Sequence, residues 1–194
     1  MNITFAGQKG GTGKTTLSFL VAETLSLVGK SVAIKDDDPQ GSLREIVEDL
    51  SSRNLTSLEI WEEENANTYD FVIVDTLPRL ASHVLKKAIR ETDCLILPLM
   101  PSMVDIRATI PLVEIINNEL HESAKARIVW NRVKQGTRIS NELDNLRSMV
   151  GIPALSVSLP DRVAYSYSVF QGYQGLTSNE LDPVHQIALE ILNL

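Results

Sequence analysis

A lysine- and glycine-rich stretch near the start of the chain, GQKGGTGKTT at 7–16, has the residue types of a phosphate-binding loop. Glycines without a Cβ let backbone N–H groups approach phosphate oxygens, and a lysine followed by threonine can contact phosphates and Mg²⁺. The standard pattern would begin with glycine at position 8, where Gln8 stands, and it has no second lysine such as Lys9. The segment therefore predicts a nucleoside triphosphate site with one extra positive charge.

The loop residues should divide the triphosphate and its metal ion between them. Lys14 should contact the β- and γ-phosphates, Thr15 should offer its hydroxyl to Mg²⁺, and Thr16 could bond the α-phosphate. A tight turn between a strand and a helix would also need glycines, but it would not need Gly-Lys-Thr-Thr. The predicted cofactor-binding residues of this loop are Gly10, Gly11, Thr12, Gly13, Lys14, Thr15 and Thr16.

Aspartates follow two apolar runs, in IKDDDPQGS at 34–42 and in YDFVIVDTLP at 69–78. A carboxylate at the carboxyl end of a parallel strand lies where ligands bind in open α/β sheets. Asp75 has the Walker B arrangement, in which the carboxylate accepts bonds from Mg²⁺-bound water. A polar turn ended by Pro39 is the alternative for the first segment. Three adjacent aspartates predict a nearby cation, and Lys35 would either point out from a sheet edge or partly neutralise them.

Apolar runs that favour strands alternate with stretches whose apolar residues have helical spacing. The strand candidates are 2–6, 31–35, 71–75, 94–99, 126–131 and 154–159. The helix candidates are 14–28, 106–120, 141–150 with Ser140 as N-cap, and 183–194. This alternation predicts an α/β fold with a mainly parallel, doubly wound sheet and helices on both faces. The stretch 51–68 is the least regular, and we expect a short helix and an acidic loop there.

Composition limits the function classes. The 194 residues suit one domain over 1–194, and the single Cys94 allows no intrachain disulfide or metal cluster, so we expect a reducing cytoplasm. No signal peptide is visible, and the apolar runs are too short to span a bilayer. The net charge of −7 argues against a uniformly basic nucleic-acid binder. The window 79–147 nevertheless holds eleven Lys and Arg against eight Asp and Glu, which would suit either scattered surface charge or one basic face.

Lys-Gly-Gly-x-Gly-Lys-Thr-Thr, together with Asp-x-Asp-Pro-Gln-Gly-Ser at 36–42, resembles the ParA/MinD family of ATPases with a deviant Walker A loop. The resemblance covers nearly the whole chain, is weakest over 44–68, and is greatest for small plasmid-type ParA proteins. Lys35 departs from the family pattern, as does Leu77, which stands where a proline is usual.

The resemblance implies a role for each matching residue. Lys9 would reach across a dimer interface to the partner's nucleotide, and Lys9, Lys14 and Asp38 would be catalytic, with Asp38 orienting or activating the attacking water. Thr15, Asp36 and Asp75 would serve the metal, Asp36 through the water shell of Mg²⁺. Asn131 would help to recognise adenine, and LPDRVAYSYS at 159–168 would close the nucleotide pocket.

The implied function is an ATP- and Mg²⁺-dependent dimerising ATPase for partition of DNA or positioning of other cargo. The dimer would bind DNA without sequence preference, and a ParB-like or adaptor protein would stimulate its slow hydrolysis and release it. We expect a cytoplasmic, nucleoid-associated protein. The candidate DNA contacts are Arg107, Arg132, Arg138, Arg147 and Arg162.

Three other classes of protein fit the sequence less well. A MinD-like membrane-cycling ATPase would need a basic amphipathic tail, whereas LDPVHQIALEILNL at 181–194 has no Lys or Arg, so we expect no stable membrane association. A biosynthetic ligase resembling dethiobiotin synthetase would not be expected to keep Lys9 with the aspartate segment. A nitrogenase-type iron protein is excluded because Cys94 alone cannot supply a shared cluster.

Overall fold

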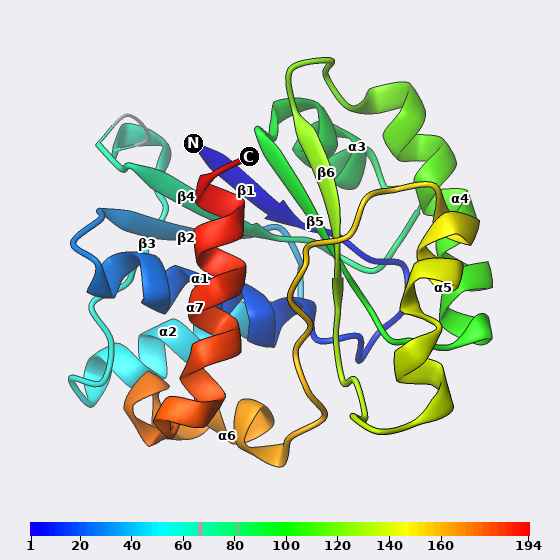
Figure 1. Cartoon of the computed structure of the whole chain (residues 1–194). Coiled ribbons are helices and arrows are strands. Elements are labelled where there is room, and N and C mark those ends of the chain that lie inside the picture. The colour runs from blue at the N-terminus through cyan, green and yellow to red at the C-terminus, as the bar shows by residue number, and fades with distance from the viewer. Residues whose placement is uncertain (66–67, 81) are drawn as a thin grey trace.

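The computed structural model describes residues 1–65, 68–80 and 82–194. Its centre is a sheet of six parallel strands in the order β3-β2-β4-β1-β5-β6 (Figure 1). The strands are β1 (Asn2–Phe5), β2 (Val32–Asp36), β3 (Glu59–Ile60), β4 (Phe71–Asp75), β5 (Cys94–Leu99) and β6 (Lys125–Trp130). The predicted α/β class with a mainly parallel sheet is confirmed.

Helices pack in two groups, one on each face of the sheet (Figure 1). The first group is α1 (Lys14–Leu27), α2 (Ser42–Ser52), α6 (Val163–Gln171) and α7 (Ser178–Leu192), and the second is α3 (His83–Glu91), α4 (Met103–Glu119) and α5 (Leu143–Val150). Alternate residues of one strand therefore pack into different hydrophobic cores. On β5, Cys94 and Ile96 pack with the first group of helices, and Leu95 and Leu97 pack with the second. This burial on both faces explains the continuous apolar strands.

Two strand predictions need correction. The segment 154–159 is not a strand: it follows β6 with only isolated bridges, Ile128 to Ala154 and Val133 to Pro160. Pro153 and Pro160 flank it and have no N–H to donate, so a continuous ladder cannot extend past either end. The two-residue β3 lies in the irregular stretch 51–68, where no strand was expected. That stretch also holds a 3-10 helix, Glu63–Asn65, while 66 and 67 lie outside the described residues.

Three helices, α2, α3 and α6, were not predicted, and the starts of predicted helices need correction. Ser140 is not the N-cap of α5, because it lies in a 3-10 helix, Arg138–Asn141, that Thr137 caps. The last helix begins at Ser178, not at 183, because Thr177 and Glu180 form a reciprocal capping box ahead of Pro183.

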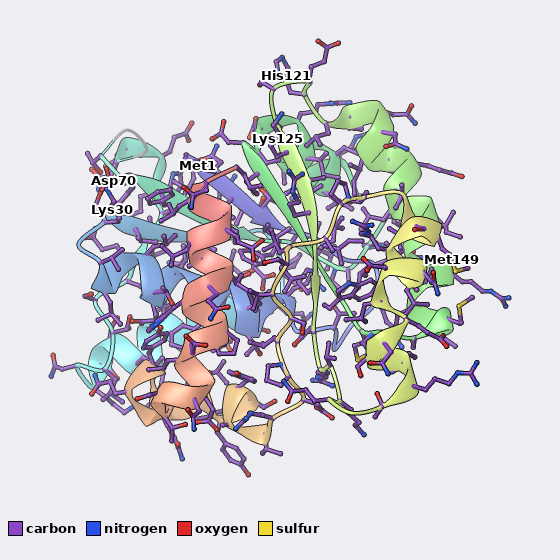
Figure 2. All side chains as sticks on the ribbon, in the orientation of Figure 1. Met1, Lys30, Asp70, His121, Lys125 and Met149 are labelled. Carbon is purple, nitrogen blue, oxygen red and sulfur yellow. The ribbon has the colours of Figure 1, made fainter. Side chains whose placement is uncertain are left out.

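Different residues lie at the two ends of the strands. Met1, Lys30, Asp70 and Lys125 lie at the edge where the strands begin (Figure 2). The N-terminal ammonium donates to the Asp70 carbonyl oxygen at 2.9 Å, and α7 also ends on this side of the molecule (Figure 1). The loops that follow β1, β2 and β4 lie at the opposite edge, which is where the predicted site residues gather. Within the described ranges, no helix combines the length and apolar character needed to cross a bilayer.

Candidate nucleotide-binding site

Strand register brings the two predicted aspartate segments beside the glycine-rich loop. Phe5 at the end of β1 pairs with Asp75 at the end of β4, which pairs with Asp36 at the end of β2. The loop leaves β1 directly after Phe5 and enters α1 at Lys14. Adjacent strand ends thus place Lys14, Thr15 and Asp75 in one cluster, as predicted.

Gly13 is the loop position where only glycine fits. Its φ of 95° lies in the left-handed region, and a Cβ there would stand 2.2 Å from Nδ2 of Asn131. That same Nδ2 donates to the Thr12 carbonyl oxygen at 2.7 Å. The end of β6 therefore fixes the loop just before α1, and the loop holds the backbone N–H groups at the start of α1 facing one region of space.

Buried charges lie at the centre of the site. Lys14 is 7% exposed, and burial lowers the pKa of its ammonium, although Asp75 and Asp38 act in the opposite direction. Burial raises the pKa of the Asp75 carboxyl to about 7, despite a hydrogen bond donated by Thr15 Oγ1 at 2.5 Å and the charge of Lys14. The other carboxylate oxygen of Asp75, Oδ1, is buried without a protein donor.

These residues fit a magnesium ion. An orphaned buried carboxylate oxygen beside a threonine hydroxyl is a ligand set that a cation or its bound water would complete. Among the described residues, no group of three or more His, Cys, Asp or Glu side chains could hold a metal by itself. This agrees with Mg²⁺, which usually takes one or two protein ligands and fills its octahedron with water and substrate phosphates.

The raised pKa of the Asp75 carboxyl predicts that the stability of the folded protein depends on pH. Its pKa rises from 3.8 to about 7 on folding, so between these values the folded protein holds a proton that the unfolded chain has released. The contribution of this proton to the free energy of unfolding is fully present below pH 3.8 and is lost as the pH rises through about 7. Without nucleotide or Mg²⁺, we expect the Tm of the wild type to fall over this window relative to that of Asp75→Asn, measured by differential scanning fluorimetry. Parallel Tm curves would contradict the assignment.

The second aspartate segment divides its side chains between two roles. Asp36 accepts hydrogen bonds from the backbone of Asp38, Leu43 and Arg44, so its carboxylate caps the start of α2. Asp38 accepts from Gln40 N at 3.0 Å and is close enough to raise the pKa of Lys14. Asp38 therefore lies near Lys14, while its catalytic role and a metal role for Asp36 stay predictions.

Lys35 lies close to one of the three adjacent aspartates. Its ammonium lies 3.6 Å from Asp37 and 5.0 Å from the ring centre of Trp61. Because β3 pairs with β2, Lys35 does not lie on an edge strand, and of the two alternatives the partial neutralisation holds.

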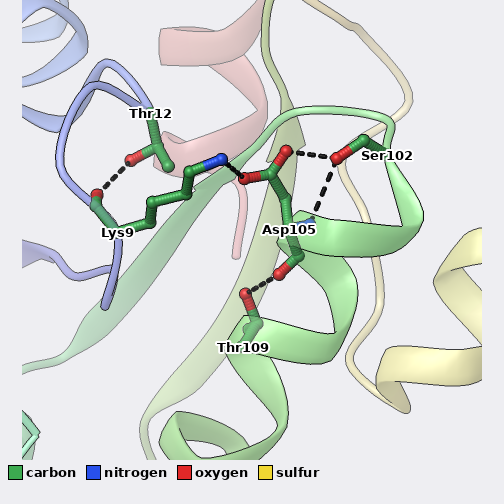
Figure 3. A network of polar contacts seen from close by, with 5 residues as sticks. All are labelled: Lys9, Thr12, Ser102, Asp105 and Thr109. Atoms are coloured by element: carbon green, nitrogen blue, oxygen red, sulfur yellow. Dashed lines mark hydrogen bonds and ion pairs between the residues drawn. The ribbon is translucent and has the colours of Figure 1, made fainter.

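Lys9 is held within its own subunit. Its Nζ donates to Oδ1 of Asp105 at 2.7 Å, and this carboxylate is 3% exposed in the first turn of α4 (Figure 3). Ser102, the N-cap of α4, donates to the other carboxylate oxygen and accepts from Asp105 N at 3.1 Å. This pairing was not predicted from the sequence, because Lys9 and Asp105 are 96 positions apart.

A recess continues from the loop away from Lys14. Its walls are Gly13, Thr16, Asn131, Pro160, Tyr165 and the side chains of Arg132 and Arg162. Asn131 and the segment 159–168 thus meet at the loop, as expected for a base pocket. Arg132 and Arg162, predicted as DNA contacts, lie here instead, whereas Arg107, Arg138 and Arg147 lie on α4, the 3-10 helix before α5, and α5.

Comparison with known proteins agrees with this geometry. The family model described as "CobQ/CobB/MinD/ParA nucleotide binding domain" matches residues 3–173. The Maintenance of carboxysome distribution protein A of Halothiobacillus neapolitanus is 27% identical, covering 96% of this chain and 94% of that protein. Protein ParA of Rhizobium radiobacter is 26% identical, covering 87% and 82%. An ATP complex of a Cyanothece McdA variant superposes with a TM-score of 0.80 at 16% identity, covering 100% and 96% of the two chains.

Proposed function

Because the chain belongs to the CobQ/CobB/MinD/ParA nucleotide-binding family, we propose that it is a Mg²⁺-dependent ATPase whose nucleotide cycle positions a cargo in the cell. Solved family members carry ATP or an analogue, and one carries magnesium as well. The observation that carries the proposal is the buried cluster of Lys14, Thr15 and Asp75 at the start of α1. Mg²⁺ supplies charge neutralisation and fixes the geometry of the β- and γ-phosphates when it is bound.

The residues around the phosphates have separate tasks in this proposal. The N–H groups of the loop and the Lys14 ammonium bind the triphosphate, and Thr15 with Asp75 orients the metal and its water. Asp38 orients the water that attacks the γ-phosphate, from the loop that follows β2. Hydrolysis in an isolated subunit is slow because the described site holds no arginine beside Lys14 to neutralise the charge of the transition state.

Lys9 makes the cycle depend on two subunits. In this structure its ammonium is paired with Asp105 of the same chain. A triphosphate carries more negative charge than one carboxylate. When ATP fills the partner's loop, Lys9 can exchange Asp105 for the partner's phosphates, which joins the two subunits only in the ATP state.

The cargo step uses non-specific DNA in this proposal. The support is a group of exposed arginines on the α4–α5 side of the molecule, Arg107, Arg138 and Arg147, and the relatives named for partition and for carboxysome distribution. In one subunit the patch is weak, because Arg138 pairs with Glu142 at 3.0 Å and Arg147 with Asp144 at 3.6 Å. Dimerisation doubles the patch. A ParB-like or adaptor protein then stimulates hydrolysis and releases the dimer.

A DNA-binding measurement tests the cargo step. A protein with Arg107→Ala, Arg138→Ala and Arg147→Ala should keep its basal ATP hydrolysis. With ATP, it should bind a labelled random duplex about tenfold more weakly than wild type, with a shallower dependence of log affinity on log salt concentration. Fluorescence anisotropy across a salt series gives both quantities.

The matched control for this test is Arg44→Ala with Arg53→Ala, which removes two exposed arginines of the α2 side that are also paired within a helical turn. Control and triple variant should differ. Equal weakening in both would show a general charge effect and would contradict a defined DNA face. Binding of ATP-loaded wild type to anionic liposomes, without binding to DNA, would favour the MinD-like alternative.

A further inference from the structure

Arg132 has a backbone conformation that its residue type disfavours. Its φ is 54°, and the only other non-glycine residue at positive φ in the described part of the chain is Asn54. Asparagine tolerates the left-handed region, whereas a long side chain such as arginine is strained there. Strained residues persist only where neighbouring structure holds them, and they cluster at functional sites.

Hydrogen bonds on both sides hold Arg132 in this conformation. Its N–H donates to Oδ1 of Asn131 at 2.9 Å, and Asn131 N donates to the Leu99 carbonyl oxygen at 2.8 Å. On the other side, Val133 N donates to the Leu159 carbonyl oxygen at 3.0 Å. The chain therefore turns at this residue directly after β6, which sends the Arg132 side chain to the recess beside Gly13 rather than along the line of the strand.

The Arg132 guanidinium has no ion-pair partner among the described residues. The carboxylate of Asp161, the residue directly before Arg162, pairs with Lys134 at 3.8 Å. Together with Arg162 and Pro160, Arg132 forms the rim of a recess that measures only about 20 Å³ in this structure. A nucleobase would therefore have to displace exposed side chains, and Arg132 and Arg162 are the long exposed side chains of the rim.

We infer that Arg132 stacks its guanidinium plane on the base of the bound nucleotide and so sets the base-dependent part of nucleotide affinity. This inference rests on the proposed ATP site. Arginine is a planar cation that stacks on aromatic rings, and a purine is the flat, polarisable part of the ligand. The phosphates already have Lys14 and the start of α1, and Lys14 is not among the residues that line the recess, so the base is the part that remains for Arg132.

Substitution of Arg132 by glycine should weaken nucleotide binding without lowering the stability of the fold. Arg132→Gly removes the guanidinium and also relieves the strain at positive φ, so its Tm should not fall. Its affinity for Mg·ATP and Mg·GTP, measured by isothermal titration calorimetry, should weaken by about tenfold. Its affinity for Mg·tripolyphosphate, which has no base, should stay within about twofold of wild type.

Two further variants complete the experiment. Arg132→Lys keeps the charge but loses the plane, so it should lose the base-dependent affinity as the glycine variant does. Asn54→Gly relieves the other positive φ far along the chain from the site, and it should leave all three affinities unchanged.

The outcomes separate the alternatives. Unchanged ATP affinity in Arg132→Gly, equal losses for ATP and tripolyphosphate, or a lower Tm together with weaker binding would each overturn the inference. They would indicate no role, a phosphate contact and a structural role, respectively. If wild type bound neither ATP nor tripolyphosphate, the proposed function itself would fail.

Discussion

Lys9→Ala protein should remain a monomer when Mg·ATP is added, under conditions in which wild type doubles in mass. The variant keeps Lys14 and the glycine loop, so its own ATP affinity should change by only a few-fold. It loses the cation that we propose crosses to the partner's triphosphate, and hydrolysis that depends on that charge should fall by about a thousandfold, the scale of an arginine finger supplied in trans. Size-exclusion chromatography with light scattering measures the mass, and phosphate release measures the turnover.

Asp105 and Lys87 provide the controls for this result. Asp105→Asn removes the carboxylate that holds Lys9 within the subunit, so the ATP-dependent dimer should form at lower protein concentration than for wild type. Lys87→Ala removes another exposed lysine, paired with Glu91 at 3.8 Å on α3, and should behave as wild type. A Lys9→Ala protein that dimerised with the wild-type constant would contradict the role of Lys9 across the interface.

Asp38→Asn should separate dimerisation from hydrolysis. The amide still accepts the hydrogen bond from Gln40 N, so the loop after β2 should keep its shape and the ATP-bound dimer should form. The amide cannot activate or hold the attacking water as a carboxylate does, so turnover should fall by roughly 10²- to 10⁴-fold. Single-turnover phosphate release, with dimer mass measured in parallel, checks both parts.

The adjacent aspartate is a matched control. Asp37 differs from Asp38 by one position, yet its carboxylate pairs with Lys35, and its pKa is raised mainly by burial. Asp37→Asn should therefore alter hydrolysis by only a few-fold. If the two variants lost turnover equally, the segment would act through its fold, and the assignment of the water to Asp38 would be wrong.

The sequence alone was sufficient to predict those elements and site residues that depend on neighbours along the chain. The glycine loop, the start of α1 at Lys14 and the aspartate at the end of β4 lie within short segments whose spacing alone predicts a strand, a turn and a helix. Their meeting at one edge follows from parallel strand order. These elements were predicted close to their observed bounds.

Features that depend on distant contacts were not predictable from local pattern. The pairing of Lys9 with Asp105 depends on α4 packing beside the loop, and no spacing rule indicates it. Arg132 and Arg162 seemed equivalent to other surface arginines until the fold brought β6 and the segment after it to Gly13. Helix α2 was missed because its start is capped by Asp36, a residue in the preceding strand, and by no local Ser or Thr.

Both ends of the polypeptide lie on the side of the molecule where the strands begin, remote from Lys14 (Figure 1). A fluorescent reporter or an affinity tag fused at either Met1 or Leu194 would therefore extend away from the catalytic loops. Live imaging of the cycle and pull-down of the stimulating partner can accordingly use the same attachment points.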